Sequence, residues 1–234
     1  MTPTDLRAVL LDIEGTTTPI SFVHEVLFPY ARLHVAAYLQ QHSDSPEVFA
    51  DLACLRQEHA ADITAGQQPP PLVEQYVYWL IDRDRKSPPL KSLQGKIWQQ
   101  GYDDGSLVAP VFEDVRPTME RWVDTGISVN IFSSGSVLAQ KLLFAHTEAG
   151  DLTKFISKYF DTGVGKKTDA DSYRQIASAL SVAPTQVHFI SDVTTELDAA
   201  ADAGMKTSLC VRPGNREQEF SSRHETIQSL YEIT

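Results

Sequence analysis

The chain has 234 residues, of which 42% are hydrophobic, and a formal net charge of −11. Enough apolar residues are present for a buried core, so a largely disordered chain is excluded. The negative charge argues against a nucleic-acid partner or an anionic membrane surface, which attract basic faces, but not against a small anionic substrate held by a metal ion and a few local cations.

An apolar run, Ala-Val-Leu-Leu at residues 8–11, predicts a short buried strand near the N-terminus. Asp12 and Glu14 follow it, and Gly15 then breaks the strand. Two carboxylates at the end of a strand favour a nucleophile and an acid/base, but Asp and Gly are equally common in solvated turns. This stretch alone does not decide between the two interpretations.

Residues 20–110 show helical spacing throughout and are expected to form an all-helical cap domain inserted after the first strand. The dipeptides Ser45-Pro46 and Ser87-Pro88 each predict a helix start, with serine as the N-cap and proline at the first helical position. Three aromatic residues at helical spacing are expected in the core of this domain rather than around a substrate: Tyr76, Trp79 and Trp98.

From residue 111 onward, strands and helices alternate, which predicts an α/β fold with a Rossmann-like, doubly wound parallel sheet. The expected strands cover residues 127–132, 158–161, 187–190 and 206–211. Residues 1–19 and 111–234 are therefore expected to form the catalytic core. The apolar residues Ile227 and Leu230 predict a final helix in the tail.

Parallel sheets bind ligands outside the carboxyl ends of their strands. Beside Asp12 and Glu14, the other strand ends carry hydroxyl groups, a lysine and a further acid: Ser133, Ser134, Lys167, Ser191 and Asp192. Carboxylates for a divalent metal, a cation and backbone N–H groups near small residues are what phosphoryl transfer requires.

Four segments resemble the four motifs of the haloacid-dehalogenase superfamily of phosphatases: Asp12-x-Glu14-Gly15-Thr16, Ser133-Ser134-Gly135-Ser136, Lys167 and Ser191-Asp192. The resemblance covers nearly the whole chain. Most members have Asp-x-Asp in the first motif, whereas this chain has Glu14 as the second acid. That departure resembles one subgroup, which enolises the methionine-salvage compound 2,3-diketo-5-methylthiopentyl-1-phosphate and then hydrolyses its phosphate.

The resemblance implies a role for each site residue. Asp12 would attack phosphorus and form an aspartyl-phosphate, and Glu14 would protonate the leaving oxygen and then activate water. Mg²⁺ would be held by the Asp12 and Asp192 carboxylates and the Glu14 backbone carbonyl. Phosphate would be bound by Ser133, the backbone at Ser134 and Lys167. The implied partner is a small phosphorylated diketone, with no nucleic acid and no membrane, and the chain is expected to be a monomer.

Each signal also has a structural alternative. Asp192 suits the N-cap of the following helix, and residues 133–136 suit an ordinary strand-to-helix turn. Lys167 could be a surface lysine. Glu196, one helical turn beyond Asp192, either holds a metal-bound water or faces solvent. Residues 212–215 are predicted to be a turn.

The sequence leaves alternatives for the function and for the enolisation step. The chain could be a generic phosphatase of the superfamily that acts on another small phosphate monoester. It could also be a phosphate-binding regulator without catalysis, although the presence of both Asp12 and Glu14 argues against this. The base for the enolisation step is not identified; Glu14 and a residue of the cap are both candidates, and the part played by His24 is equally open.

The remaining signals concern the cellular compartment. Cys54 and Cys210 have no metal-binding or redox spacing, which predicts reduced thiols. The N-terminus lacks the basic and apolar regions of a signal peptide. No window approaches the ~18 uninterrupted apolar residues of a membrane span. We therefore expect a cytoplasmic protein.

Overall fold

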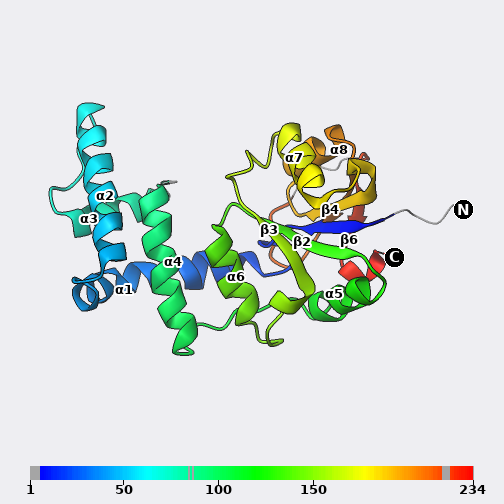
Figure 1. The fold of residues 1–234 in the computed structure, drawn as a ribbon, viewed down its shortest axis with the longest axis horizontal. Helices are drawn as coiled ribbons and strands as arrows, with labels where there is room; N and C mark the ends of the chain where they lie inside the picture. Colours follow the sequence, from blue (N-terminus) through cyan, green and yellow to red (C-terminus); the bar gives the residue numbers. More distant parts are fainter. Residues whose placement is uncertain (1–5, 84, 86, 218–221, 234) are drawn as a thin grey trace, which may run out of the picture. The chain divides into compact units, whose positions relative to one another are not determined.

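The computed structural model describes residues 6–83, 85, 87–217 and 222–233. It divides into two compact units, Met1–Val23 with Val108–Thr234, and His24–Leu107. The boundaries expected from the sequence, 19/20 and 110/111, lie a few residues from these. The first unit contains the sheet, and the described residues of the second form helices and connecting loops without a strand (Figure 1).

The sheet has six strands, all parallel, in the order β3-β2-β1-β4-β5-β6. The strands are β1 (Ala8–Leu11), β2 (Ser128–Phe132), β3 (Ile156–Phe160), β4 (Val187–Ser191), β5 (Lys206–Cys210) and β6 (Glu225–Ile227). The chain moves outward from β1 through β2 to β3, and then returns to β4 on the other side of β1. The order therefore reverses beside β1, which is where open α/β sheets bind their ligands. The predicted doubly wound α/β fold is confirmed.

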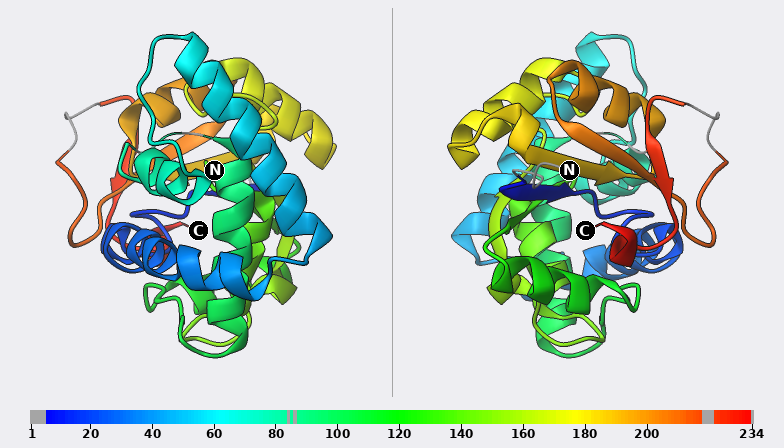
Figure 2. Two further views of the ribbon diagram at one scale, coloured as in Figure 1. Left: turned by 90° about the vertical axis from the view of Figure 1, so that its left-hand side faces the viewer. Right: turned by 90° about the vertical axis from the view of Figure 1, so that its right-hand side faces the viewer.

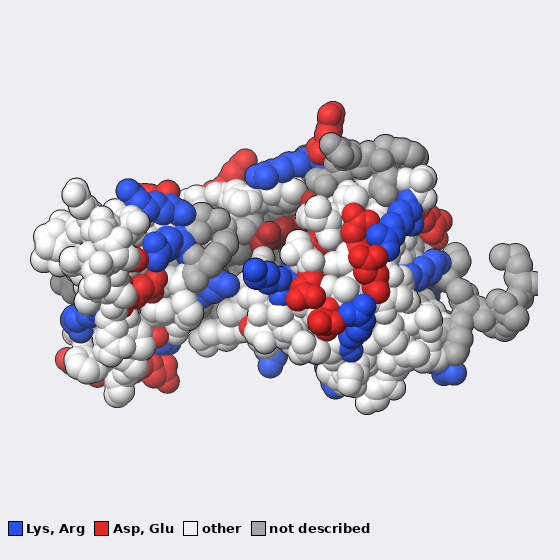
Figure 3. Space-filling model, turned by 90° about the horizontal axis from the view of Figure 1, so that it is seen from above, with Lys and Arg blue, Asp and Glu red and all other residues white. Residues whose placement is uncertain are grey.

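Helices cover both faces of this sheet. They are α5 (Val115–Asp124), α6 (Val137–Ala145), α7 (Ala170–Leu180) and α8 (Thr194–Asp202). Figures 1 and 2 show α7 and α8 over one face and α5 by the opposite face. This is the result of right-handed crossovers that run in opposite directions along the sheet. Seen from the side of α7 and α8, the surface of this unit carries interspersed charges of both signs (Figure 3).

The core under α7 and α8 is built by strand alternation. Ala8 and Leu10 point to the same face of β1 and join a buried cluster with Tyr173 of α7 and Leu197 of α8. All four side chains are fully buried. The central strand is thus fixed on its inner face, and its carboxyl end is a rigid support for the residues that follow.

The tail differs from the sequence-based prediction of a final helix. Ile227 belongs to β6, where it lies beside Cys210 of β5, and Leu230 starts a single 3-10 turn, η4 (Leu230–Glu232). The backbone N–H of Val211 donates to the Ile227 carbonyl at 2.8 Å. A three-residue apolar spacing does not distinguish a helix from a strand followed by a turn, and pairing with the sheet edge decides the outcome here.

A π-helical turn, η1 (Phe22–Leu27), spans the unit boundary. The second unit then contains α1 (Phe28–Gln41), α2 (Pro46–Thr64), α3 (Val73–Ile81) and α4 (Pro88–Asp103). The two predicted N-caps are confirmed: Ser45 accepts from the Val48 N–H and Ser87 from the Leu90 N–H. Tyr76 and Trp98 are buried in this unit as expected, while Trp79 is half-buried. Its ring stacks on Tyr76 with centroids 5.6 Å apart.

Two further expectations concern the cysteines and the membrane. Cys54 and Cys210 are both free thiols. Within the described part of the chain, none of the helices combines the length and the apolar character that a membrane crossing requires.

Candidate active site

Asp12 lies directly after β1, and its carboxylate is held by three donors. Oδ1 accepts from the Ile13 backbone N–H at 2.8 Å and lies 2.7 Å from Lys167 Nζ. Oδ2 accepts from the Ser191 hydroxyl at 3.0 Å. The residue is 5% exposed. Both oxygens are therefore fixed in position, as a nucleophile that must line up with phosphorus requires.

The loop after Asp12 closes on itself and buries three threonines in a row, Thr16, Thr17 and Thr18. The backbone N–H groups of all three donate to the Ile13 carbonyl. Gly15 has a φ of +70°, which a residue with a side chain rarely adopts. Glu14 is half-buried, and its backbone pairs with that of Thr18. The loop thus holds the second acid two residues from the first; the acid/base role of Glu14 stays a prediction.

Lys167 is the cation of the site and is only 9% exposed, so the alternative of a surface lysine is wrong. Its Nζ lies 2.7 Å from Asp12 Oδ1 and 2.6 Å from Glu196 Oε2. Burial by itself lowers the pKa of the Lys167 amine, but the two carboxylates outweigh it and raise this pKa above its ordinary value. The Tyr173 hydroxyl donates to the Lys167 carbonyl at 2.7 Å and positions its backbone.

Glu196 faces this site and not the solvent, which rules out one of its two sequence-based alternatives. Its carboxylate pairs with Lys167 and lies 3.1 Å from the Ser191 hydroxyl. That hydroxyl also lies against Asp12 and has one proton, so it donates to only one of the two carboxylates at a time. Burial first, and then the Asp12 charge, raises the pKa of Glu196 to about 7.

Asp192 follows β4 and is buried beside Gly15. A Cβ added at Gly15 would lie 2.4 Å from Asp192 Oδ2, so only glycine allows this approach. The N-cap alternative for Asp192 is wrong, because helix α8 has Val193 as its N-cap residue, without a side-chain cap. Burial, followed by the charges of Asp12 and Glu196, raises the pKa of Asp192 to about 7.

The donor set fits a hard divalent cation. Among the described residues, no three His, Cys, Asp or Glu side chains are grouped so that they could hold a metal ion. Mg²⁺ needs no such group, because it is commonly bound through one or two carboxylates and keeps several waters. Asp12 and Asp192 offer these carboxylates, and the Glu14 carbonyl offers a further oxygen. Lys167 pairs with Asp12 and Glu196, while the buried Asp192 carboxylate is a third acid of the same site.

Ser133 and Ser134 lie at the end of β2, next to β1 in the sheet. Ser133 is buried and its hydroxyl accepts from the Gly135 N–H at 3.1 Å, while Ser134 is exposed. Phe132, the last residue of β2, has its ring centroid 5.8 Å from Lys167 Nζ, so this strand end is close to the lysine. The alternative of an ordinary strand-to-helix turn at residues 133–136 holds in part, because the Ser136 hydroxyl accepts from the Ala139 N–H and so caps α6. Phosphate binding by the two serines stays a prediction.

The turn predicted at residues 212–215 has a structural role that the sequence does not reveal. Arg212 is buried, donates from Nε to the Thr16 carbonyl at 3.2 Å and forms an ion pair with Asp114 at 2.9 Å. Asn215 donates from Nδ2 to the Gly15 carbonyl at 2.9 Å. Both side chains therefore hold the loop that carries the two acids. No local pattern reveals this, because the partners are distant in the sequence.

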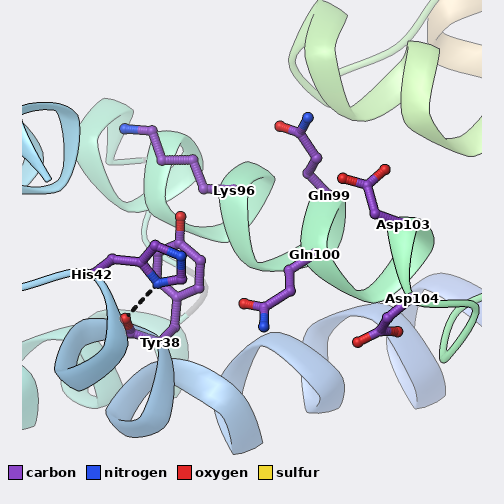
Figure 4. A pocket seen from close by; sticks show the side chains of 7 residues that line it. All are labelled: Tyr38, His42, Lys96, Gln99, Gln100, Asp103 and Asp104. Atoms are coloured by element: carbon purple, nitrogen blue, oxygen red, sulfur yellow. Dashed lines mark hydrogen bonds between the residues drawn. The ribbon is translucent and has the colours of Figure 1, made fainter.

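A separate pocket of about 440 Å³ lies within the helical unit (Figure 4). The rings of Tyr38 and His42 stack there with centroids 4.2 Å apart, and Lys96 pairs with Asp51 at 2.5 Å. The lining residues are Tyr38, His42, Lys96, Gln99, Gln100, Asp103 and Asp104. None of the predicted site residues is among them. His24, also in this unit, is exposed.

A family model described as haloacid dehalogenase-like hydrolase matches residues 6–204, in agreement with the fold and the buried aspartate. The chain is 51% identical to an enolase-phosphatase E1 of Synechococcus elongatus over 99% of both chains. It is 46% identical to an enolase-phosphatase E1 of Drosophila mojavensis, over 92% of this chain and 90% of that one. The crystal structure of the UTR4 protein of Saccharomyces cerevisiae is similar with a TM-score of 0.81 and 36% identity, over 96% of this chain and 98% of that one.

These similarities extend over nearly the full length on both sides. The chain therefore belongs to the haloacid dehalogenase-like hydrolases and, among them, to the enolase-phosphatase E1 family.

Proposed function

We propose that this chain is a bifunctional enolase-phosphatase of methionine salvage. It enolises 2,3-diketo-5-methylthiopentyl-1-phosphate and then removes the phosphate, which gives the acireductone 1,2-dihydroxy-3-keto-5-methylthiopentene. The supporting observation is the Asp12 carboxylate, buried where the strand order reverses and held between Lys167 and Ser191. The relatives called enolase-phosphatase E1 support the two activities, enolisation and phosphate hydrolysis.

The phosphatase half proceeds in two displacements at phosphorus. Asp12 attacks, the bond from phosphorus to the substrate oxygen breaks, and an aspartyl-phosphate forms. Glu14 donates its proton to the leaving oxygen. It then takes a proton from a water that attacks the same phosphorus, which releases inorganic phosphate and restores Asp12. Lys167, Ser133 and the backbone at Ser134 bind the phosphoryl oxygens.

Magnesium completes this site in the proposal. The Asp12 and Asp192 carboxylates and the Glu14 backbone carbonyl would hold it. When bound, it supplies positive charge to the phosphate and to an enediolate oxygen. The chain's own contribution is the rigid placement of two buried carboxylates, one on each side of the point where the strand order reverses.

The enolase half requires a base that removes a proton from a carbon next to a carbonyl group. Glu14 and a residue of the helical unit are the two candidates. Lys167 can stabilise the enediolate oxygen with its charge. In this proposal residues 1–19 and 111–234 are the catalytic core, residues 20–110 are the cap, and the protein is a cytoplasmic monomer.

Two signals measured in one reaction test this function. With the diketone phosphate and Mg²⁺, absorbance follows the enol and acireductone while a phosphate assay follows hydrolysis. We expect both signals from the wild type and no phosphate release from Asp12→Asn. The control is Asp171→Asn, the same substitution at an exposed acid on α7 that pairs only with the nearby Arg174 among the described residues, and it should keep the wild-type rate.

The outcomes separate the proposal from its alternatives. Strong activity on several unrelated phosphate esters with none on the diketone would identify a generic phosphatase. Unchanged phosphate release by Asp12→Asn would remove Asp12 from the nucleophile role. A wild type that binds the diketone phosphate and converts none of it would favour a regulator that binds phosphate without catalysis.

A further inference from the structure

Asn215, in the turn after β5, has an amide whose orientation is fixed by its surroundings. Its Nδ2 donates to two backbone carbonyls, those of Gly15 at 2.9 Å and Cys210 at 3.2 Å. Carbonyl oxygens only accept hydrogen bonds, so the amide nitrogen must face them and the amide oxygen must face the other way. The position of Asn215 Oδ1 therefore follows from the hydrogen bonds and not from an arbitrary choice between O and N.

This oxygen is buried and, among the described residues, has no hydrogen-bond donor. Asn215 Oδ1 lies beside Gly15, as does the carboxylate of Asp192, the acid expected to bind the metal. A Cβ placed on Gly15 would be 2.9 Å from Asn215 Oδ1 and 2.4 Å from Asp192 Oδ2. Both oxygens therefore lie on the same side of Gly15, closer to it than a side chain at this position would allow.

An amide oxygen and a carboxylate oxygen both accept hydrogen bonds, so neither satisfies the other. A group that carries positive charge or donates protons would satisfy both oxygens. A bound cation with its water molecules meets both needs, because the cation attracts the carboxylate and its waters have protons to donate. Mg²⁺ typically keeps several waters when it binds to one or two carboxylates.

We propose that Asn215 is a positioning residue of the metal site, whose Oδ1 accepts a hydrogen bond from a water on the Mg²⁺ held by Asp192. The inference rests on the Mg²⁺ dependence in the proposed function. It assigns two tasks to one side chain: the amide nitrogen holds the loop at Gly15, and the amide oxygen orients the water. Residues that orient metal ligands in this way commonly change metal affinity about 10- to 100-fold when they are removed.

The test is metal binding without substrate, measured by calorimetry with Mg²⁺ and by the paramagnetic signal of Mn²⁺. We expect Asn215→Ala to weaken binding at least about tenfold. Asn130→Ala is the matched control. The amide nitrogen of Asn130 also donates to a backbone carbonyl, that of Val9, and its oxygen also has no donor within the described part of the chain. Asn130 lies in the middle of β2. This variant should bind the metal as the wild type does. Circular dichroism verifies that each variant is folded.

Two further variants separate the oxygen from the loop. Arg212→Lys loosens the same loop at Thr16 without removing an oxygen from the metal site. Asn215→Asp loses the donors to Gly15 and Cys210 but keeps an oxygen that can accept from the water. We expect both variants to bind metal within about threefold of the wild type, far less than the loss expected when the partner of a metal-bound water is removed.

Three other results would contradict either the role of Asn215 or the proposed metal dependence. If Asn215→Ala binds metal as tightly as the wild type, the inference is wrong while the proposed function stands. If Asn215→Ala and Arg212→Lys weaken binding equally, Asn215 acts through the loop only, and the inference is again wrong. If the wild type binds neither Mg²⁺ nor Mn²⁺, the metal dependence in the proposed function fails first.

Discussion

Replacing Arg212 by methionine should destabilise the sheet unit more than most single substitutions. The guanidinium binds Asp114 through two nitrogens, Nη1 at 2.9 Å from Oδ2 and Nη2 at 3.0 Å from Oδ1. It also donates to the carbonyls of Thr16 and Gln228. The side chains of Arg212 and Asp114 are only 5% and 2% exposed. Methionine keeps much of the volume but leaves the Asp114 carboxylate without its cation.

The size of the effect follows from this burial. Breaking a buried ion pair by removing one partner costs about 3–5 kcal/mol, because the other charge remains in a poorly solvated place. Asp114 keeps two donors, the Ser229 hydroxyl at 2.7 Å and the Leu230 N–H at 2.6 Å. We therefore expect the lower end, a loss of about 3 kcal/mol in the free energy of unfolding.

Urea unfolding followed by tryptophan fluorescence measures this loss. The substitutions Trp79→Phe and Trp98→Phe remove the tryptophans of the helical unit. The remaining tryptophan, Trp122, is buried in the sheet unit. Two further variants, Asp114→Leu and the double variant Arg212→Met with Asp114→Leu, complete a double-mutant cycle. Because the double variant leaves no unpaired charge, its loss should be smaller than the sum of the single losses by about 2 kcal/mol. A loss under about 1 kcal/mol for Arg212→Met, or an additive cycle, would refute the reasoning.

Three more predictions concern the acid/base, the loop glycine and a buried histidine. Glu14→Ala should lower phosphate release roughly a hundredfold or more, the scale of general acid/base catalysis, and an unchanged rate would move the acid elsewhere. Gly15→Ala should lower the free energy of unfolding more than Gly126→Ala. Both glycines have positive φ, but only at Gly15 does an added Cβ overlap another residue, and equal losses in urea would contradict this. Burial, with a smaller effect of Lys206, lowers the pKa of His188 to about 3. Below its ordinary pKa of 6.5 the unfolded chain gains a proton that the folded chain excludes, so this stability is present above pH 6.5 and is lost toward pH 3. The loss in the free energy of unfolding should reach about 2 kcal/mol at pH 5. If the free energy of unfolding of His188→Gln falls between pH 6.5 and 5 as steeply as that of the wild type, the prediction is wrong.

How much the sequence predicts depends on how local the signal is. The strand before Asp12 was predictable because an apolar run ended by an acid and a glycine is visible within a few residues. At β4 the strand Val187–Ser191 likewise ends at an acid, Asp192, although no glycine follows it. Parallel pairing then brings both strand ends to one edge of the sheet, so their proximity follows from the fold class alone.

The contacts that hold the loop were not predictable in the same way. Arg212 and Asp114 are 98 residues apart, and Asn215 and Gly15 are 200 apart. No spacing rule connects such pairs, and an isolated Arg-Pro-Gly-Asn segment has the composition of an ordinary turn. The tail shows the same limit, since Ile227 and Leu230 fit a helix until the sheet edge is known.

The position of β1 also has a consequence for the synthesis of the protein. Leu11 pairs with Ile131 on one side and with Ile190 on the other, so the central strand needs partners made much later. Chains emerge from the ribosome with the N-terminus first, and contacts distant in sequence form slowly. The compact helical unit, His24–Leu107, lies between β1 and both of these partners in the chain and is synthesised before them. Asp12 therefore emerges well before β4, and its carboxylate gains its final surroundings only when β4 has emerged.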